Sequence, residues 1–271
     1  MYWFPPQRLR VQSNAPTLAT VTPGTAITTG ASESAKGTPV QIFSATDFDV
    51  FGITLVLSNY GTNGAASDAM LDLLVGPNDD VLIPNLIAGY SLPWLQGGLV
   101  FRFSLYIPAG VKVSAQVAGR RTSTSMQLQA FLTGGMLSPP WRVGSRVTAY
   151  GVTSVPTGTL VNASYSGEGA WTEITSSTTD DHFQVVPAMQ FRNRSTSASN
   201  RPVVLDYGVG SSGNEIELGT CQYMTSSNES MTALGDLRGE NVSVAAGSRL
   251  VTRISTDGNP TDFDCALYGV T

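Results

Sequence analysis

Charged residues are scarce in this chain. Asp, Glu, Lys and Arg make up 13% of its 271 residues, against roughly a quarter in typical soluble domains. The 15 basic residues are outnumbered by 20 acidic ones, so the formal net charge at pH 7 is -5. A broad positive field that would attract phosphates is missing, and we expect no nucleic-acid partner.

Other signals of specialised function are also missing. There is no apolar run of about 18 residues, so we expect no membrane span, and the opening MYWFPPQRLR lacks the charged-then-apolar order of a secretory signal. Nucleotide-binding, nucleophile-elbow and zinc-protease motifs do not occur. The two cysteines, Cys221 and Cys265, are too few for a disulfide scaffold and lack metal-ligand spacing. We therefore expect no cofactor, no metal site and no enzymatic activity.

Residues that could carry acid-base chemistry are few. The single histidine, His182, lies in TTDDHFQVV, where we expect a surface loop, and Asp180 and Asp181 beside it would point to opposite faces of a strand. Asp47 and Asp49 form a similar pair. Such aspartates are typical of turns at strand ends. The enzymatic alternative, cleavage of a polysaccharide, would need two carboxylates across one cleft.

The sequence contains an internal repeat. A shift of 134 positions (158 minus 24) superposes glycine, threonine, aspartate and asparagine landmarks: Gly158 and Thr159 on Gly24 and Thr25, Asp181 on Asp47, Asn193 on Asn59, Asp206 on Asp72, and Gly210 on Gly76. A shift of 137 (247 minus 110) superposes Gly247 on Gly110, Arg249 on Lys112 and Ile254 on Val117 within the stretches AAGSRLVTRIS and IPAGVKVSAQV, and, further along the chain, Phe263 on Met126 and Tyr268 on Phe131. So long a period indicates tandem domains.

Each copy has about seven short strand-like runs separated by turn-rich spacers. Alternation of Val113, Ala115 and Val117 with polar residues recurs in Leu250, Thr252 and Ile254, which predicts one buried face. We therefore predict an all-β protein of two tandem antiparallel, jelly-roll-like β-sandwich domains related by duplication. The expected parts are an N-terminal arm (1–21), domain 1 (22–135), a Pro-rich connector (136–156) and domain 2 (157–271).

The repeat also assigns the cysteines. Cys265 aligns with Leu128 and Cys221 with Ile87, both apolar strand positions. We therefore expect two buried thiols rather than a disulfide. In the connector, Pro139 and Pro140 favour an extended path, and we expect Trp141 to pack it against one domain.

Two aromatic clusters are candidate contact sites. The arm carries Tyr2, Trp3, Phe4, Arg8 and Arg10 outside the repeat. Three consecutive exposed aromatics favour docking on a neighbouring subunit or another protein, and the alternative is packing against domain 1.

The second cluster, Tyr90 and Trp94, lies in the loop AGYSLPWLQGG. Exposed aromatic rings can stack on sugar rings, although intersubunit or core packing also explains them.

The strands IPAGVKVSAQV and AAGSRLVTRIS, followed by MQLQAFL and DFDCALYGV, resemble the closing strands of domains in tailed-bacteriophage virion proteins of the fibre, baseplate, collar or head-decoration type. The resemblance implies a structural protein located in the virion. It also implies a homo-oligomer, as a trimer or ring, that attaches to other virion proteins through the arm and contacts host-surface carbohydrate. A lectin-like carbohydrate-binding module and a double-jelly-roll capsid protein, with its two units side by side as one block, are the alternatives.

Overall fold

The computed structural model confirms an all-β protein, whose described part consists of strands, turns and loops without an α-helix. No helix in the part of the chain that it places is long and apolar enough to cross a membrane. The structure describes residues 9–14, 24–58, 69–88, 99–120, 122–135, 139, 141–152, 156–165, 167–192, 201–225, 231–233, 237–238, 241–258 and 262–271.

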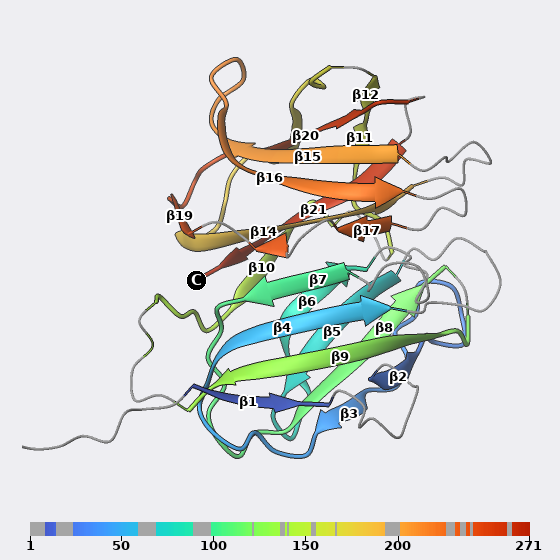
Figure 1. Ribbon diagram of the computed structural model, residues 1–271, viewed down its shortest axis with the longest axis vertical. Coiled ribbons are helices and arrows are strands. Elements are labelled where there is room, and N and C mark those ends of the chain that lie inside the picture. The colour runs from blue at the N-terminus through green and yellow to red at the C-terminus, as the bar shows by residue number, and fades with distance from the viewer. Residues whose placement is uncertain are drawn as a thin grey trace, which may run out of the picture.

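The first half of the chain forms two sheets that pack face to face as a jelly roll (Figure 1). One sheet has the order β1 (Arg10–Ser13), β9 (Ser125–Gly134), β4 (Val50–Ser58), β7 (Leu99–Phe103), and β2 (Thr25–Thr28) also pairs with β9. The other has the order β3 (Val40–Phe43), β8 (Val113–Gly119), β5 (Ala69–Val75), β6 (Asp80–Ile87).

The second half repeats this arrangement. Its first sheet has the order β10 (Val147–Tyr150), β21 (Asp262–Val270), β14 (His182–Phe191), β19 (Asn241–Val244), with β11 (Thr159–Asn162) on β21. Its second sheet has the order β12 (Ser164–Tyr165), β20 (Leu250–Thr256), β15 (Arg201–Val209), β16 (Ile216–Thr225), β17 (Met231–Ala233), with β13 (Thr172–Thr175) on β20. One short strand, β18 (Leu237–Arg238), crosses over and pairs in parallel with β7.

Strand registers agree between the two halves. Thr25 lies opposite Leu128, and Thr159 lies opposite Cys265, which reproduces the shifts of 134 and 137. The pairs β3–β8 and β13–β20 also carry an irregularity at the same place, just before Phe43 and Thr175. Because a slip by one residue would turn a strand's apolar side chains to the other face, agreement of register means that the same face is buried in both halves.

One part of the sequence alignment is wrong. Ile53 lies opposite Leu132, and Val185 lies opposite Gly269, so β14 follows β4 at a shift of 132 (185 minus 53). Asp181 therefore corresponds to Asp49 and not to Asp47. The second copy has two residues fewer between β11 and β14 than the first has between β2 and β4, a difference that loops absorb without disturbing the sheets.

The corrected shift reveals a loop that is built identically in both halves. The hydroxyl of Thr46 donates to the carbonyl oxygen of Pro108 at 2.6 Å, and Thr178 donates to Ala245 at 2.8 Å. Each hydroxyl also accepts from the backbone N–H three residues after that carbonyl, Val111 or Ser248, at 3.1 Å in both cases. One carboxylate completes each loop: Asp49 accepts from the amide of Ala109 at 2.9 Å and Asp181 from that of Ala246 at 2.7 Å.

Both cysteines are buried free thiols, as predicted. Cys265 is fully buried in β21, and burial raises the pKa of its thiol far above the ordinary value. Cys221 lies opposite Leu205 as Leu86 lies opposite Leu71, so its counterpart is Leu86, one residue from the Ile87 of the sequence alignment. The two thiols act as small apolar side chains in the core.

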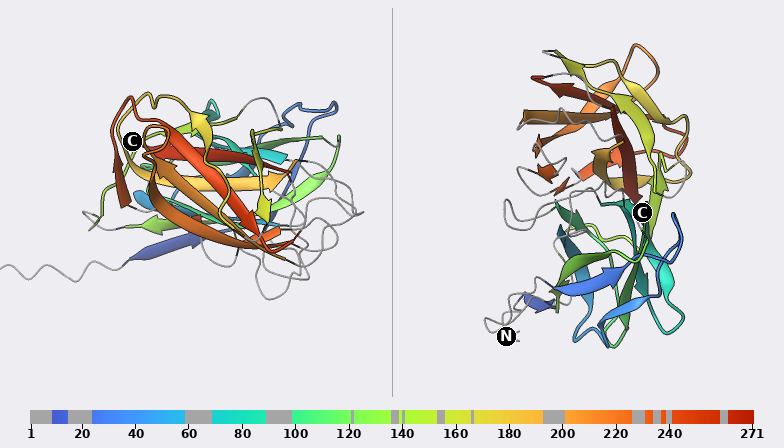
Figure 2. Two further views of the ribbon diagram at one scale, coloured as in Figure 1. Left: turned by 90° about the horizontal axis from the view of Figure 1, so that it is seen from above. Right: turned by 90° about the vertical axis from the view of Figure 1, so that its right-hand side faces the viewer.

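The two jelly rolls pack asymmetrically, with an edge of the first against a face of the second (Figures 1 and 2). Strands β6 and β7, at one edge of the first jelly roll, contact β10, β14 and β21 of the second. All ten residues of β14 are therefore buried, whereas residues of its counterpart β4 alternate between buried and half-buried. An edge that would otherwise leave backbone groups open to other chains is covered within this chain.

Hydrogen bonds fasten this interface. The Tyr268 hydroxyl, fully buried, donates to the carbonyl oxygen of Asn85 at 2.7 Å and accepts from the amide of Ile87 at 2.8 Å. The Gln184 side chain accepts from the amide of Ser104 at 2.9 Å and donates to the carbonyl oxygen of Arg102 at 3.1 Å. Apolar side chains from both jelly rolls form one continuous core cluster. The two jelly rolls are thus joined as one block.

Parts of the predicted arm and connector belong to the sheets. Residues 10–13 of the arm form β1 on β9, and residues 147–150 of the connector form β10 on β21. Trp141 packs the connector onto the first jelly roll, where its indole N–H donates to the carbonyl oxygen of Phe51 at 3.4 Å. The limits of the arm, connector and domains stay predictions.

Candidate functional site

An open pocket lies where the connector passes between the two jelly rolls. Its volume is about 420 Å³, within the range of roughly 300–1,000 Å³ that small-ligand pockets occupy. The first jelly roll contributes Phe51 and Tyr106, the second contributes Phe183 and Thr271, and the connector contributes the other lining residues. The lining residues are Phe51, Tyr106, Pro139, Arg142, Val143, Gly144, Ser145, Phe183 and Thr271. We call this site the joint pocket.

The walls of the joint pocket are aromatic. Phe51 of β4 stacks on Tyr106, with ring centroids 5.9 Å apart and planes at 24°. From the other side, the Arg142 guanidinium lies 4.9 Å from the ring centroid of Phe183 in β14. Phe51 and Phe183 are 132 residues apart, so they occupy the same position in the two repeats. The pocket thus contains the same phenylalanine position of both repeats. Phe51 packs against Tyr106, and Phe183 packs against Arg142.

The connector residues that line the pocket are held in place by backbone hydrogen bonds. Gly144 donates to the carbonyl oxygen of Ser104 at 2.9 Å and accepts from the amide of Tyr106 at 2.8 Å. Ser145 donates to the carbonyl oxygen of Thr271 at 2.8 Å. A Cβ atom at Gly144 would lie 2.4 Å from that same oxygen, so the close approach requires glycine. The pocket is therefore preformed.

Arg142 is the one charged side chain among the residues that line the pocket in the described part of the chain. No acidic side chain is among the lining residues, and within the described segments Arg142 forms no ion pair. Its guanidinium is held over an aromatic ring, an arrangement that leaves N–H donors at its edge. The pocket can therefore accept an aromatic ring or a proline, and its positive rim can bind an anionic or carbonyl oxygen. The exposed Tyr106 and Trp141 widen the aromatic surface, being 41% and 38% accessible.

Close to the pocket, His182 is buried, and the prediction that it lies in a surface loop is wrong. It is the first residue of β14 and only 2% accessible. Its Nε2 lies 2.8 Å from the hydroxyl of Tyr150, which accepts from the amide of Thr179 at 3.0 Å. Burial, the largest effect, lowers the pKa of His182, although Asp180 opposes it. The two aspartates before it indicated a turn, but His182 occupies the position of the core residue Val50, and its ring packs inside the second jelly roll against Tyr150 and Gly269.

The paired aspartates stabilise loops. Asp49 and Asp181 accept backbone N–H bonds in the repeated loop described above, which agrees with the turn role expected for them. Asp180 forms an ion pair with Arg146 at 2.7 Å. Among the residues that the structure places, no group of three or more His, Cys, Asp or Glu side chains could hold a metal ion.

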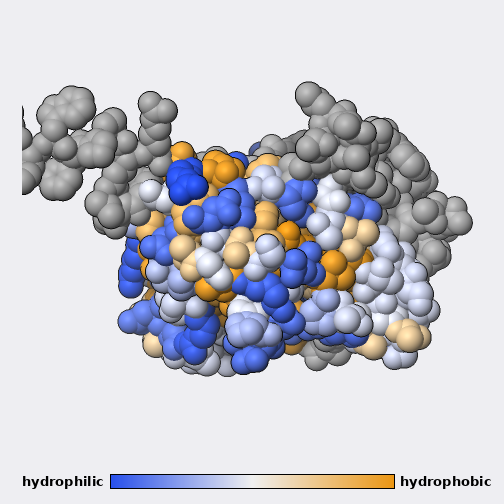
Figure 3. All heavy atoms as spheres, turned by 90° about the horizontal axis from the view of Figure 1, so that it is seen from below, coloured by the Kyte–Doolittle hydropathy of each residue, from blue (hydrophilic) through white to orange (hydrophobic). Residues whose placement is uncertain are grey.

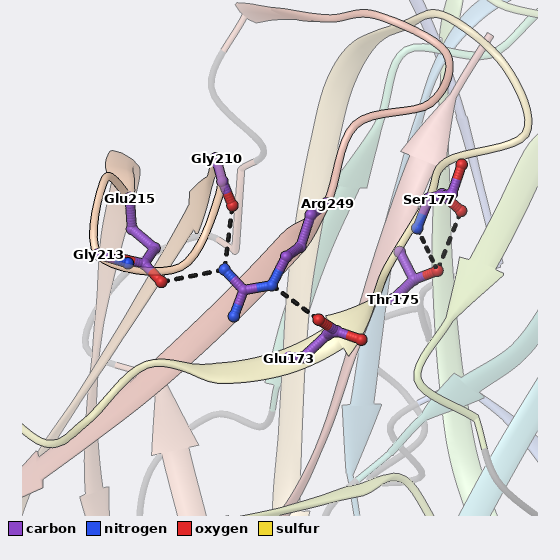
Figure 4. A network of polar contacts seen from close by, with 7 residues as sticks. All are labelled: Glu173, Thr175, Ser177, Gly210, Gly213, Glu215 and Arg249. Atoms are coloured by element: carbon purple, nitrogen blue, oxygen red, sulfur yellow. Dashed lines mark hydrogen bonds and ion pairs between the residues drawn. The ribbon is translucent and has the colours of Figure 1, made fainter.

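The outer sheet of the second jelly roll carries a charged network that the sequence did not reveal (Figure 4). Arg249 donates to Glu173 at 2.7 Å and to Glu215 and the carbonyl oxygen of Gly210, both at 3.0 Å. The bond from Arg249 is the main reason that the pKa of Glu215 is lowered. In the first jelly roll, Lys112 and Asp79 form the corresponding ion pair at 2.8 Å.

Further along the same strand, Arg253 is surrounded by acids. Its guanidinium lies 4.4 Å from the ring centroid of Trp171 and pairs with three carboxylates, those of Glu168, Asp206 and Glu217. Its position corresponds to Gln116 of the first jelly roll, which donates to Asp72 at 2.8 Å. Since the network supplies its own counter-charges, this face holds strands together and does not present a bare cation to a ligand.

The structure locates only one of the predicted site residues. Arg10 lies in β1, where its guanidinium is 4.8 Å from the ring centroid of Phe48 on the first jelly roll. Tyr2, Trp3, Phe4, Arg8, Tyr90 and Trp94 lie outside the described residues, so their docking and sugar-contact roles stay predictions.

The joint pocket itself was missed from sequence. Its one signal was the recurrence of phenylalanine at positions 51 and 183, and this signal appears only at a shift of 132, after the loop between the strands is aligned correctly.

Comparisons with known proteins identify no family. No protein-family model matches the sequence, and no curated protein matches it significantly. Among solved structures, PNGase F, a glycosylasparaginase from Flavobacterium meningosepticum, is 9% identical, with a TM-score of 0.41 and coverage of 97% of this chain and 96% of that chain. The viral capsid protein STIV MCP is 9% identical, with a TM-score of 0.36 and coverage of 97% and 96%.

A tandem carbohydrate-binding module pair, CBM22-1-CBM22-2 of Paenibacillus barcinonensis Xyn10C, is 12% identical, with a TM-score of 0.27 and coverage of 97% of this chain and 91% of that chain. These three proteins include an enzyme, a capsid protein and binding modules. At such identities and TM-scores, the likeness assigns no activity, substrate or partner to this chain.

Proposed function

We propose that this chain is a structural subunit of a viral particle, built as a double jelly roll, that acts by assembly and not by catalysis. The observation that carries the proposal is the joining of two equivalent jelly rolls into one block with a buried, hydrogen-bonded interface. Within that class, we favour a shell subunit over a fibre or other appendage, because the two units lie side by side as one block.

A rigid block suits a shell for a physical reason. Domains joined by a flexible linker change their relative angle, whereas a shell subunit has to present its contact surfaces at constant angles. Here the edge strands of one jelly roll are covered by the other, and the connector is hydrogen-bonded along its path between them. The outer surfaces of the block are then left as the places where neighbouring subunits bind.

Apolar side chains on these outer surfaces support self-association. Three of these side chains, Leu9 just before β1, Val11 in β1 and Val81 in β6, are each more than half exposed. In the second jelly roll, Tyr165 and Ile216 are 61% and 67% exposed. Figure 3 shows the end of the molecule formed by the first jelly roll, where apolar patches lie between hydrophilic ones. Large apolar side chains at several separate places favour contact with more than one neighbour.

Assembly is tested by electron microscopy and sedimentation velocity of the purified protein over a range of concentrations. We expect closed particles, sheets or rings whose repeating unit has two lobes. The variant Ile216→Asp should shift the protein toward smaller species without lowering its melting temperature, and Ser211→Asp, on an exposed turn of the same jelly roll, is the matched control. A single 28.5-kDa species at every concentration would contradict the proposal.

A further inference from the structure

We infer that the joint pocket receives the aromatic segment Tyr2–Trp3–Phe4 of a neighbouring copy of the chain, so that arm and pocket form an intersubunit contact. The inference rests on the proposed function, because it names the surfaces through which the subunits would join. It uses two features that the fold leaves without a role: a preformed aromatic pocket and three consecutive aromatic side chains outside the repeat.

The chemistry of the two surfaces is complementary. The pocket offers the rings of Phe51, Tyr106 and Phe183 and the guanidinium of Arg142. Aromatic side chains prefer offset or edge contacts with other rings, and a cation over a ring adds attraction. The pocket volume of about 420 Å³ lies in the lower half of the range of ligand pockets, which suits one or two side chains and not a large ligand. Aromatic residues seated in such pockets commonly dominate the energy of protein interfaces.

The arm enters the sheet near the pocket of its own chain, since Arg10 and Val50 both lie opposite Gly134, so the stiffness of the segment before Arg10, and not distance, favours the pocket of a neighbour. The arm joins the sheet at Arg10, opposite Gly134, at the end of β9 from which the connector departs toward the pocket. Five residues lie between Trp3 and Leu9, so these two residues can be about 20 Å apart when the segment is extended. The adjacent prolines Pro5 and Pro6 favour an extended path and oppose a tight reversal into the pocket of the same chain.

Cysteine cross-linking separates these paths. One variant carries Phe4→Cys, which retains Tyr2 and Trp3, and another carries Ser145→Cys at the exposed rim of the pocket. When the two single variants are mixed and mildly oxidised, we expect a disulfide-linked dimer between them. Mixing Phe4→Cys with Ser211→Cys, which lies on an exposed turn of the second jelly roll, should give at least tenfold less dimer. The native cysteines are buried and do not compete.

Each outcome is decisive. A double variant with Phe4→Cys and Ser145→Cys in one chain is oxidised in parallel; a link within that chain, without a linked dimer in the mixture of single variants, means that the arm occupies its own pocket and overturns the inference. No link above the Ser211→Cys control also overturns it and leaves the pocket to another ligand, such as a sugar. If particles or rings nevertheless form in the microscope, assembly stands and only the arm contact fails.

A second measurement does not depend on engineered thiols. Replacing Tyr2, Trp3 and Phe4 together by serine should weaken self-association at least tenfold by sedimentation, which corresponds to about 1.4 kcal/mol. Pocket variant Tyr106→Ala should weaken it to a similar extent, with an unchanged melting temperature. Gln7→Ser is the control within the arm. Unchanged self-association of the arm variant would refute the contact.

Discussion

The hydroxyl of Tyr268 provides the sharpest test of the joined block. It is fully buried and bridges two backbone groups of β6, the carbonyl of Asn85 at 2.7 Å and the amide of Ile87 at 2.8 Å. In Tyr268→Phe the ring remains, but both backbone groups lose their partner in a site that water does not reach. An unsatisfied buried group costs about 1–3 kcal/mol. Allowing for partial relaxation, we expect a loss of about 2–4 kcal/mol, or roughly 30- to 700-fold in the folding constant.

Urea unfolding monitored by tryptophan fluorescence measures this loss as a lower midpoint at a constant slope. Hydrogen exchange gives an independent reading, because the amide of Ile87 should exchange faster in the variant. Tyr165→Phe, which removes a hydroxyl from a side chain that is 61% exposed, is the control and should change stability by less than about 0.5 kcal/mol. A loss below about 0.5 kcal/mol in Tyr268→Phe would show that its hydroxyl does not hold the jelly rolls together.

Three further predictions concern the repeat, the buried histidine and the thiols. Thr46→Val and Thr178→Val should each destabilise the fold by about 1–3 kcal/mol in urea unfolding, since each breaks the same loop contacts, and unequal losses would argue against equivalent loops. The pKa of His182 is lowered by burial, so the unfolded chain binds its proton more readily. Stability should therefore be greatest above about pH 6.5 and decline as the pH falls below it, and His182→Gln should flatten that decline in urea midpoints taken from pH 7.5 to 5. A thiol reagent should modify neither Cys221 nor Cys265 in the native protein and both after unfolding, and reaction of the native protein would contradict their burial.

Much of the fold could be predicted from the sequence, because strand patterns depend on local alternation. The alternation predicted for Val113, Ala115 and Val117 lies in β8, and that predicted for Leu250, Thr252 and Ile254 lies in β20. The shift of 137 placed Leu250 on Val113, and both residues are buried at the same register of their sheets. Period-two alternation on a half-buried sheet is visible in one sequence without any tertiary information.

The alternation of apolar and polar residues does not predict how a strand is oriented where both of its faces are covered. Ala188 and Val186 are fully buried beside Val185 in β14, so no polar phase marks which side faces the partner jelly roll. His182 was misplaced for a different reason: polar residues before a strand resemble a turn, whereas its ring lies inside its own jelly roll and is paired with the Tyr150 hydroxyl. The shift of 132 in this region was hidden by a loop of different length.

The joint pocket was harder to predict from the sequence than the fold was. Phe51, Tyr106, Arg142 and Phe183 are far apart along the chain and converge only through the packing of an edge on a face. None carries a motif, because an aromatic pocket needs ring planes at suitable distances and no fixed residue spacing. The aromatic arm was visible in the sequence, but its binding partner could not be read from it.

The sequence alone determined two copies of one β-sandwich, the phase of their buried faces and the buried state of the thiols, because each depends on neighbours within a strand or on the repeat itself. Only the tertiary structure decided how the copies meet. Two equivalent units could have packed symmetrically, yet the edge of the first lies on the face of the second, where Tyr268 bonds to the backbone of β6. Contacts between distant surfaces follow from shape and from which polar groups find partners, and neither is encoded in local periodicity.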